Sequence, residues 1–267
     1  MNTTHQYQSQ QTALITGACS GIGYQLACLF ASDNYNLVLI DRWGEKLAEI
    51  AEQFPKKFEI AVKSIVKDLS KPTSPEEIFT EVQNSDIKID VLVNNAGFGT
   101  YGLFHEIDLM TELEMMQVNV VCLTRLTKLF LKDMVKQGRG KILNVSSTAA
   151  FQPGPLMAVY FATKAYVLSF SEAIANELEG TGVTVTVLCP GPTASAFHER
   201  TGMADSKLLK GKKMMDAQTV AQLGYSGLLA NKTLVIPGVK NKLLVEIVKL
   251  APREQVTKIV RSLQEVK

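Results

Sequence analysis

The chain has 267 residues, of which 46% are hydrophobic and 20% charged, the composition of an ordinary globular protein. This length suits one large α/β domain with a sizeable core, and nothing in the sequence demands a second domain. The formal net charge of +2 at pH 7 is close to neutral, so it gives no support to a nucleic-acid or acidic-membrane partner.

Apolar runs of strand length alternate with longer amphipathic stretches from residue 12 almost to the end of the chain. In chain order, the pattern predicts strands at residues 12–16, 36–40, 58–66, 89–93, 140–145, 183–188 and 233–236. Between them it predicts helices at residues 21–32, 45–53, 75–85, 112–136, 157–178 and 217–230. The strands are continuously apolar, which is typical of a parallel sheet covered by helices on both faces. We therefore predict a doubly wound α/β fold in a single domain, residues 12–238.

The two ends of the chain differ from this pattern. Residues 1–11 are polar and lack the apolar core of a signal peptide, so we expect a disordered lead-in. Residues 239–267 contain two amphipathic stretches, 241–250 and 252–266, each with one apolar face. We expect a helical extension that packs on the body or on a neighbouring subunit, with binding to a membrane surface or a partner as the alternative.

The four cysteines and three histidines are scattered, with neither a C-x-x-C pair nor a metal-ligand spacing. We therefore expect reduced thiols that pack as small apolar side chains, and no metal site. No run approaches the ~18 apolar residues that a membrane span needs. A cytoplasmic protein fits these observations.

A glycine-rich turn directly follows the first predicted strand and leads into a helix: Thr16-Gly17-Ala18-Cys19-Ser20-Gly21-Ile22-Gly23. Glycines allow a tight turn and a close approach of the backbone to a pyrophosphate. The start of the helix then presents free N–H groups and a positive dipole end to the anion. Asp41 ends the second strand, where a carboxylate accepts hydrogen bonds from a ribose diol. Together these features predict dinucleotide binding.

Tyr160 and Lys164 lie four residues apart in the predicted helix 157–178, so their side chains share one face. A phenol is almost fully protonated at neutral pH, and proton exchange is most efficient when the pKa lies near the working pH. A nearby ammonium, together with the positive charge of a bound nicotinamide, lowers the pKa of a phenol. We therefore expect a lowered pKa for Tyr160 and interpret it as the proton-transferring group. The alternative is an ordinary pair on an amphipathic helix.

The spacings T-G-x-x-x-G-x-G and Y-x-x-x-K resemble the short-chain dehydrogenase/reductase family. The resemblance runs from Thr12 to about Thr193. Residues 95–102 and 147–155 resemble a bacterial, ketoacyl-reductase-like branch of unassigned substrate. The resemblance implies a single-domain Rossmann fold that assembles as a homodimer or homotetramer.

The resemblance also implies roles for two further polar residues. Ser147 lies thirteen residues before Tyr160 and would hydrogen-bond the substrate oxygen. Asn119 matches the family asparagine that positions a water in the proton relay towards Lys164. Turn capping is the alternative for the two serines, and only the spacing favours Ser147 over Ser146.

Further matches to the family concern the cofactor. The turn Asn95-Ala96-Gly97 resembles the family's segment beside the cofactor, and Asp68-Leu69 lies where the family contacts the adenine amino group. The segment from Pro190 to Thr193 follows the sixth strand, where the family meets the nicotinamide carboxamide. Lys164 is expected to bond the nicotinamide ribose as well.

The residues at the end of the second strand favour different cofactors. The Asp41 carboxylate would repel the 2′-phosphate of NADP, whereas Arg42 would pair with it. Relatives in this branch commonly have a neutral residue followed by Arg and look NADP-preferring, so Asp41 is a departure. Because an exposed ion pair is worth only about 0.2–1 kcal/mol, we expect NAD as the main cofactor, with some use of NADP through Arg42.

The predicted activity is hydride transfer between a nicotinamide cofactor and a ketone, an aldehyde or a secondary alcohol, which is the expected small-molecule partner. The aperiodic segment 190–216 is expected to be a substrate loop. Epimerase or dehydratase chemistry on the same fold remains open. A catalytically weak NAD(P)-binding sensor or a membrane-associated partner protein would also fit this fold. A sensor usually lacks one or more catalytic residues, whereas this sequence has all four expected ones. Five apolar residues belong either to an apolar substrate pocket or to simple packing: Phe98, Phe151, Met157, Phe197 and Met203.

Overall fold

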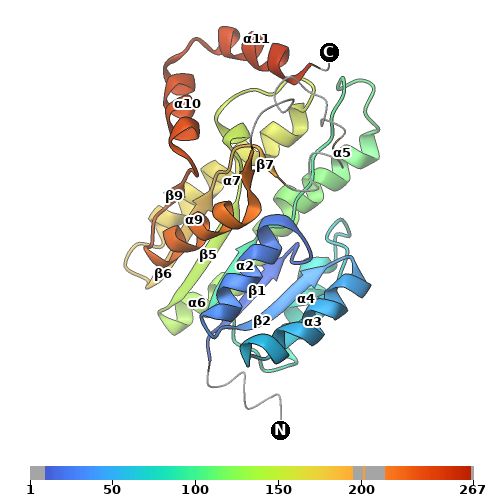
Figure 1. The fold of residues 1–267 in the computed structure, drawn as a ribbon, viewed down its shortest axis with the longest axis vertical. Helices are drawn as coiled ribbons and strands as arrows, with labels where there is room; N and C mark the ends of the chain where they lie inside the picture. The colour runs from blue at the N-terminus through green and yellow to red at the C-terminus, as the bar shows by residue number, and fades with distance from the viewer. Residues whose placement is uncertain (1–9, 195–200, 202–213, 266–267) are drawn as a thin grey trace.

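The computed structural model describes residues 10–194, 201 and 214–265 (Figure 1). Most of the expected lead-in and of the expected substrate loop, with Phe197 and Met203, lies outside these residues. Within them, the apolar runs form the strands of a central sheet, and the amphipathic stretches form helices that surround it.

In the described residues, seven parallel strands form the sheet, in the order β3-β2-β1-β4-β5-β6-β9. Alternate side chains of a strand face opposite sides, and both sides are buried: Ala13 and Ile15 belong to one core cluster and Leu14 to the other. This explains the continuously apolar runs and confirms the predicted doubly wound fold. The strands are β1 (Thr12–Thr16), β2 (Asn36–Asp41), β3 (Val62–Val66), β4 (Val91–Asn94), β5 (Gly140–Val145), β6 (Val183–Leu188) and β9 (Leu234–Val235).

Helices cover both faces of the sheet (Figure 1). One core cluster contains side chains of α2 (Gly21–Ser32), α3 (Gly44–Phe58) and α9 (Ala217–Leu229). Two clusters on the other face contain side chains of α4 (Ser74–Gln83), α6 (Leu123–Gln137) and α7 (Ala158–Glu177). Three short elements lie near the carboxyl edge of the sheet: the 3-10 turn η2 (Thr148–Phe151) and the paired strands β7 (Thr193–Ala194) and β8 (Met215–Asp216).

The strand predicted at residues 58–66 begins later than expected, because the preceding helix α3 continues to Phe58. Leu47, Ile50 and Phe54 are buried on one face of α3, and this packing carries the helix through Pro55. Glu59 then ends the helix in the left-handed conformation, with φ of 56°.

The helix predicted at residues 112–136 is longer and is interrupted. It begins as α5 (Leu109–Met116), where the Asp108 carboxylate accepts a hydrogen bond from the Thr111 N–H at 2.8 Å. It then passes through a π-helical turn, η1 (Gln117–Cys122), before continuing as α6. Such π-turns frequently occur at functional sites, and this one contains Asn119.

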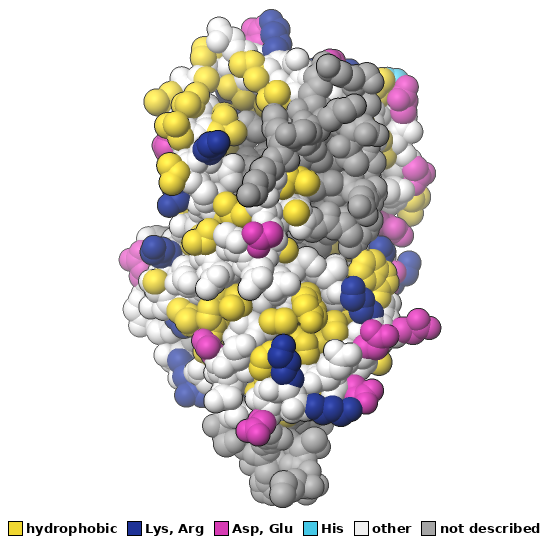
Figure 2. Space-filling view, in the orientation of Figure 1, with side chains coloured by type: hydrophobic (Ala, Val, Ile, Leu, Met, Phe, Trp, Pro, Cys, Tyr) yellow, Lys and Arg dark blue, Asp and Glu magenta, His cyan; other side chains and the backbone are white. Residues whose placement is uncertain are grey.

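The tail forms two helices, α10 (Val239–Leu250) and α11 (Arg253–Gln264), which lie beyond the carboxyl edge of the sheet (Figure 1). Hydrophobic side chains gather over α10 at the upper left of Figure 2, and Val239 and Leu250 are among the most exposed of them. In contrast, α11 buries Val256 and Val260 against the body of the molecule. Among the described residues, no helix has the length and apolar character needed to cross a membrane.

We predict that Phe30→Ala lowers the free energy of unfolding by about 3–5 kcal/mol, because it leaves a cavity in the core. Phe30 is fully buried, and its ring packs edge-on against Tyr35 and Tyr225, with centroid distances of 5.1 and 4.8 Å. Chemical denaturation measures the change. Leu250→Ala, on the exposed face of α10, is the control and should stay within about 0.5 kcal/mol. Equal effects of the two variants would contradict this description of the core.

Candidate active site

A cleft runs along the carboxyl ends of the parallel strands. The strand order reverses between β1 and β4, and ligands bind at such a switch point because the loops on either side diverge. Residues that follow six different strands line the cleft: Gly17, Arg42, Lys67, Asp68, Asn95, Ser146, Ser147 and Pro190.

The glycine turn forms the floor of the cleft. Gly17 and Gly21 have φ of 68° and 54°, in the left-handed region that favours glycine. A Cβ on Gly23 would lie 2.2 Å from the Gly17 carbonyl oxygen, so only glycine lets α2 approach the turn this closely. Gly23 therefore packs behind the turn, whereas Gly17, Ser20, Gly21 and Ile22 line the cleft. The turn fits a pyrophosphate at the start of α2.

Hydrogen bonds fasten the glycine turn to the end of β4. The Thr16 hydroxyl oxygen accepts hydrogen bonds from the backbone N–H groups of Asn95 and Ala96, each at 3.0 Å. In return, the Asn95 side-chain amide donates to the carbonyl oxygens of Thr16 and Gly17 at 2.9 and 3.2 Å. Asn95 and Ala96 thus border the cleft and fix its two sides relative to each other.

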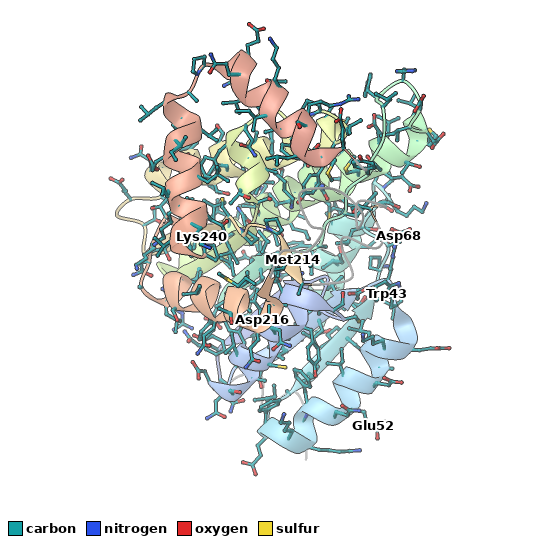
Figure 3. All side chains as sticks on the ribbon, turned by 45° about the horizontal axis from the view of Figure 1, so that its top comes forward. Trp43, Glu52, Asp68, Met214, Asp216 and Lys240 are labelled. Carbon is teal, nitrogen blue, oxygen red and sulfur yellow. The ribbon has the colours of Figure 1, made fainter. Side chains whose placement is uncertain are left out.

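Asp41 lies at the other end of the glycine turn. Its carboxylate accepts hydrogen bonds from the backbone N–H groups of Cys19 at 2.9 Å and Trp43 at 3.3 Å. These bonds hold the carboxylate at the cleft wall with lone pairs left for a ribose diol. Trp43 also lines the cleft, and in Figure 3 it lies close to Asp68, which follows the neighbouring strand β3. Trp43 was not among the predicted site residues, although its position directly after Asp41 and Arg42 was a usable signal.

Arg42 is exposed and interacts electrostatically with Asp68. Burial alone would raise the pKa of Asp68, but hydrogen bonds from Ser70 and the nearby charges of Lys71 and Arg42 outweigh it and hold the pKa below its ordinary value. Asp68 is therefore charged at neutral pH, and its charge attracts the Arg42 guanidinium. Leu69 is buried beside it and also lines the cleft.

Tyr160 and Lys164 lie in the first turns of α7, and both are buried, with 9% and 5% of their surfaces exposed. The Lys164 Nζ lies 5.7 Å from the centre of the Tyr160 ring. It donates a hydrogen bond to the Val145 carbonyl oxygen at 3.0 Å. Because an ammonium has three donors, this bond leaves others for a ligand in the cleft.

The expected lowering of the pKa of Tyr160 required a bound nicotinamide as well as Lys164, and the protein on its own does not show it. Burial raises this pKa to about 12, and a hydrogen bond with Ser147 only partly opposes the rise. Burial also lowers the pKa of Lys164 to about 8, because it disfavours the charged form of each side chain. The protein alone therefore holds Tyr160 as a neutral phenol.

The two serines face different partners. The Ser147 side chain, besides its bond with Tyr160, accepts a hydrogen bond from the Ala149 N–H at 3.1 Å. The Ser146 hydroxyl donates to the backbone oxygen of Lys164 at 2.8 Å and is buried. The Ser147 hydroxyl also donates to the Pro190 carbonyl oxygen at 3.4 Å, and its bond with Ala149 caps η2, as the alternative interpretation expected. Both serines thus bond backbone groups, and Ser147 is the one that is also paired with the phenol.

Asn119 lies behind the cleft wall, where it is buried. Its side chain accepts a hydrogen bond from the Phe98 N–H at 3.1 Å and donates to the Phe98 oxygen at 2.9 Å and the Thr163 hydroxyl at 3.1 Å. A Cβ on Gly97 would lie 3.0 Å from the Asn119 Oδ1 and 3.4 Å from the Lys164 Nζ. Asn119 therefore joins the turn after β4 to α7 beside Lys164, and one lone pair of its Oδ1 remains for a further donor.

The tail completes the cleft beyond Tyr160. Pro190 and Thr193 line it after β6, and Gly191 between them packs closely against Asn241. A Cβ on Gly191 would lie 2.6 Å from the side-chain nitrogen of Asn241.

Phe151, one of the predicted pocket residues, is not part of the cleft wall; it packs in the cluster around β6. Figure 3 shows Lys240 at the start of α10, next to Asn241 in the chain. Apolar and polar side chains share this end: Phe98, Met157, Phe161, Leu244, Gln152 and Gln264.

Comparisons with known proteins agree with this geometry. The family profile described as short chain dehydrogenase matches residues 11–205. The ketoacyl reductase HetN of Nostoc sp. (strain PCC 7120) is 28% identical over 257 residues, which cover 96% of this chain and 85% of HetN. The 17-beta-hydroxysteroid dehydrogenase type 3 of Mus musculus is 35% identical over 184 residues, covering 67% and 59% of the two chains.

A solved structure is also similar over most of the chain. The short-chain dehydrogenase from Sphingobium yanoikuyae in complex with NADPH superimposes with a TM-score of 0.82 at 28% identity, and the match covers 89% of this chain and 92% of that one. The chain belongs to the short-chain dehydrogenase family. It is an NAD(P)-dependent oxidoreductase that acts on alcohol or carbonyl groups.

We predict different outcomes for the two neighbouring serines. Ser147→Ala removes the hydroxyl that bonds with Tyr160 and should lower kcat/KM by about 10²-fold or more. Ser146→Ala should mainly cost stability, about 1 kcal/mol, because its hydroxyl is buried against the backbone. Steady-state kinetics and thermal melting of both variants separate the two effects. The assignment fails if Ser146→Ala loses more activity than Ser147→Ala.

Proposed function

We propose that this protein reduces ketones or aldehydes to alcohols with Tyr160 as proton donor. The observation that carries the proposal is the hydrogen-bonded pair of Ser147 and Tyr160 on the cleft wall, next to the buried Lys164. The bound nicotinamide would supply the hydride. The chain's own residues then have to hold the carbonyl oxygen and deliver a proton to it.

The two hydroxyl groups divide this work. Ser147 and Tyr160 would both donate hydrogen bonds to the carbonyl oxygen, which polarises the bond and stabilises the negative charge that develops on the oxygen. The Tyr160 proton would then pass to this oxygen. Lys164 would bond the nicotinamide ribose with its remaining donors and stabilise the phenolate left on Tyr160. Asn119 connects α7 to the turn after β4 through its hydrogen bonds with Thr163 and Phe98.

Reduction starts from a neutral phenol, and burial, which raises the pKa of Tyr160 to about 12, keeps this phenol neutral in the protein on its own. A neutral phenol is ready to donate a proton to a developing alkoxide, whereas oxidation of an alcohol requires a phenolate that accepts one. The relatives named ketoacyl reductase and very-long-chain 3-oxoacyl-CoA reductase are consistent with this direction.

The cleft beyond Tyr160 favours an apolar substrate. Phe98, Met157, Phe161 and Leu244 all line this end. Burial of apolar surface stabilises a ligand by roughly 25 cal/mol for each Å². We infer that the carbonyl compound carries a hydrophobic body that these side chains contact.

NAD is the cofactor that the ribose end of the cleft favours. The Asp41 carboxylate is fixed at the cleft wall by the Cys19 and Trp43 N–H groups, so it cannot turn away from a 2′-phosphate without losing both bonds. Arg42 is exposed, and the charge of Asp68 offsets part of the attraction that Arg42 would exert on a 2′-phosphate. We therefore propose NAD as the main cofactor, with weaker use of NADP through Arg42.

Tyr160→Phe should reduce kcat by about 10²–10⁴-fold, because it removes the proton donor and leaves the ring in place. Cofactor affinity should stay near the wild-type value. Trp43 is the one tryptophan of the chain and lines the cleft, so its fluorescence can report cofactor binding. Tyr166→Phe is a matched control on the exposed side of α7 and should keep full activity. Retention of more than about a tenth of the turnover by Tyr160→Phe would remove the basis of the proposal.

Replacing Asp41 should move cofactor preference towards NADP. Asp41→Asn removes the charge but keeps an acceptor for the Cys19 N–H, so it tests repulsion with the turn intact; Asp41→Ala tests loss of both. Each should lower the ratio of kcat/KM with NAD to that with NADP, by about tenfold for about 1.4 kcal/mol of relieved repulsion. Arg42→Ala should raise the same ratio. A wild-type enzyme at least about tenfold better with NADP would refute the cofactor proposal.

A further inference from the structure

The buried face of α11 ends in a polar residue. Val256, Val260 and Gln264 follow one another at four-residue intervals and are all buried. The two valines pack in the cluster that contains Met157, Tyr160 and Phe161. Gln264 occupies the next position on this face, where a third apolar side chain would continue the packing. It is only 1% exposed, and it lines the cleft.

The backbone of Gln264 is anchored independently of its side chain. The Tyr101 hydroxyl donates a hydrogen bond to the Gln264 carbonyl oxygen at 2.6 Å. This bond joins the loop after β4 to the end of α11. It is a main-chain contact of residue 264, so a substitution of the side chain leaves it in place.

The side-chain oxygen of Gln264 has no hydrogen-bond partner among the described residues, although it is enclosed. Buried polar atoms in native proteins nearly always have a partner, and an exception requires an explanation. Phe98, Met157 and Leu244 on the surrounding wall are apolar, and the polar Gln152 at the same end does not bond this oxygen. A group brought in by a ligand of the cleft would supply the missing partner.

We propose that Gln264 determines substrate specificity by hydrogen-bonding a hydroxyl group of the substrate that is remote from the reacting carbonyl. A hydroxyl both donates and accepts, so it satisfies an amide in either orientation about its last side-chain torsion. The inferred substrate class is therefore an apolar carbonyl compound with a second, hydroxyl-bearing end. This inference rests on the proposed reductase function and adds a substrate class to it.

The test uses methyl ketones of increasing chain length and the matching ω-hydroxy methyl ketones, each assayed with NADH and NADPH. For each pair, the ratio of kcat/KM measures the preference for the hydroxyl. The wild-type enzyme should prefer the hydroxy ketone by about threefold to tenfold at one chain length, the gain of one neutral hydrogen bond. Gln264→Leu, similar in volume but unable to form the bond, should bring this ratio close to one.

Two further variants separate recognition from structure. Gln264→Asn keeps the amide on a shorter side chain, so the preferred hydroxy ketone should become longer. Ser262→Ala, exposed on the opposite side of α11, should keep the wild-type ratio. Thermal melting of all three variants checks that the fold is retained. An unchanged preference in Gln264→Leu, or no preference at any chain length in the wild type, would overturn the proposal.

Each ketone of a pair is also titrated separately into the NAD-bound protein in a calorimeter. This gives a Kd for each ketone without the need for turnover. If the wild type turns over no ketone, the proposed reductase function fails, and the difference in Kd between the pair still decides the role of Gln264. Tighter binding of the hydroxy ketone that disappears in Gln264→Leu supports the subsite. Equal Kd values for the pair in the wild type reject it.

Discussion

The whole cleft depends on the junction that Thr16 makes between β1 and β4. Its hydroxyl oxygen accepts hydrogen bonds from two backbone N–H groups of the turn after β4. The Asn95 side-chain amide donates two hydrogen bonds to backbone oxygens of the glycine turn. These are the neighbouring strands at which the order of the sheet reverses. Without this junction, separate loops would position the two sides of the cleft independently. With it, both sides are held at fixed positions relative to the buried Thr16 side chain.

Burial of Tyr160 and Lys164 is the second constraint, and it acts against ionisation of both. Tyr160 packs in a cluster with Met157 and Phe161, and each of the two side chains loses the solvation that favours its charged form. Sequence spacing alone shows that the two heads share a helix face, but it carries no information about solvent. The direction of the pKa shift of Tyr160 in the protein alone was therefore predictable only from the packed structure, where burial raises the pKa.

The fold was predictable because local signals specify it. Continuous apolar runs marked the strands, and the glycines marked the turn between β1 and α2 that lines the cleft. The π-helical turn around Asn119 and the continuation of α3 through Pro55 were not predictable, because tertiary packing overrides local propensity in both. The burial of Gln264 could have been predicted from the sequence, because this residue continues the four-residue spacing of Val256 and Val260.

The bond between Tyr101 and Gln264 joins residues 163 positions apart in sequence. Contacts of this separation form late in folding, because a long loop must close before they contribute. A chain synthesised only as far as α7 already contains the glycine turn and the Tyr160–Lys164 pair, but β6, the segment from Pro190 to Thr193, α9 and the tail are still missing. During biosynthesis, the substrate end of the cleft should thus be the last part completed, because it needs the tail that closes with the Tyr101–Gln264 bond.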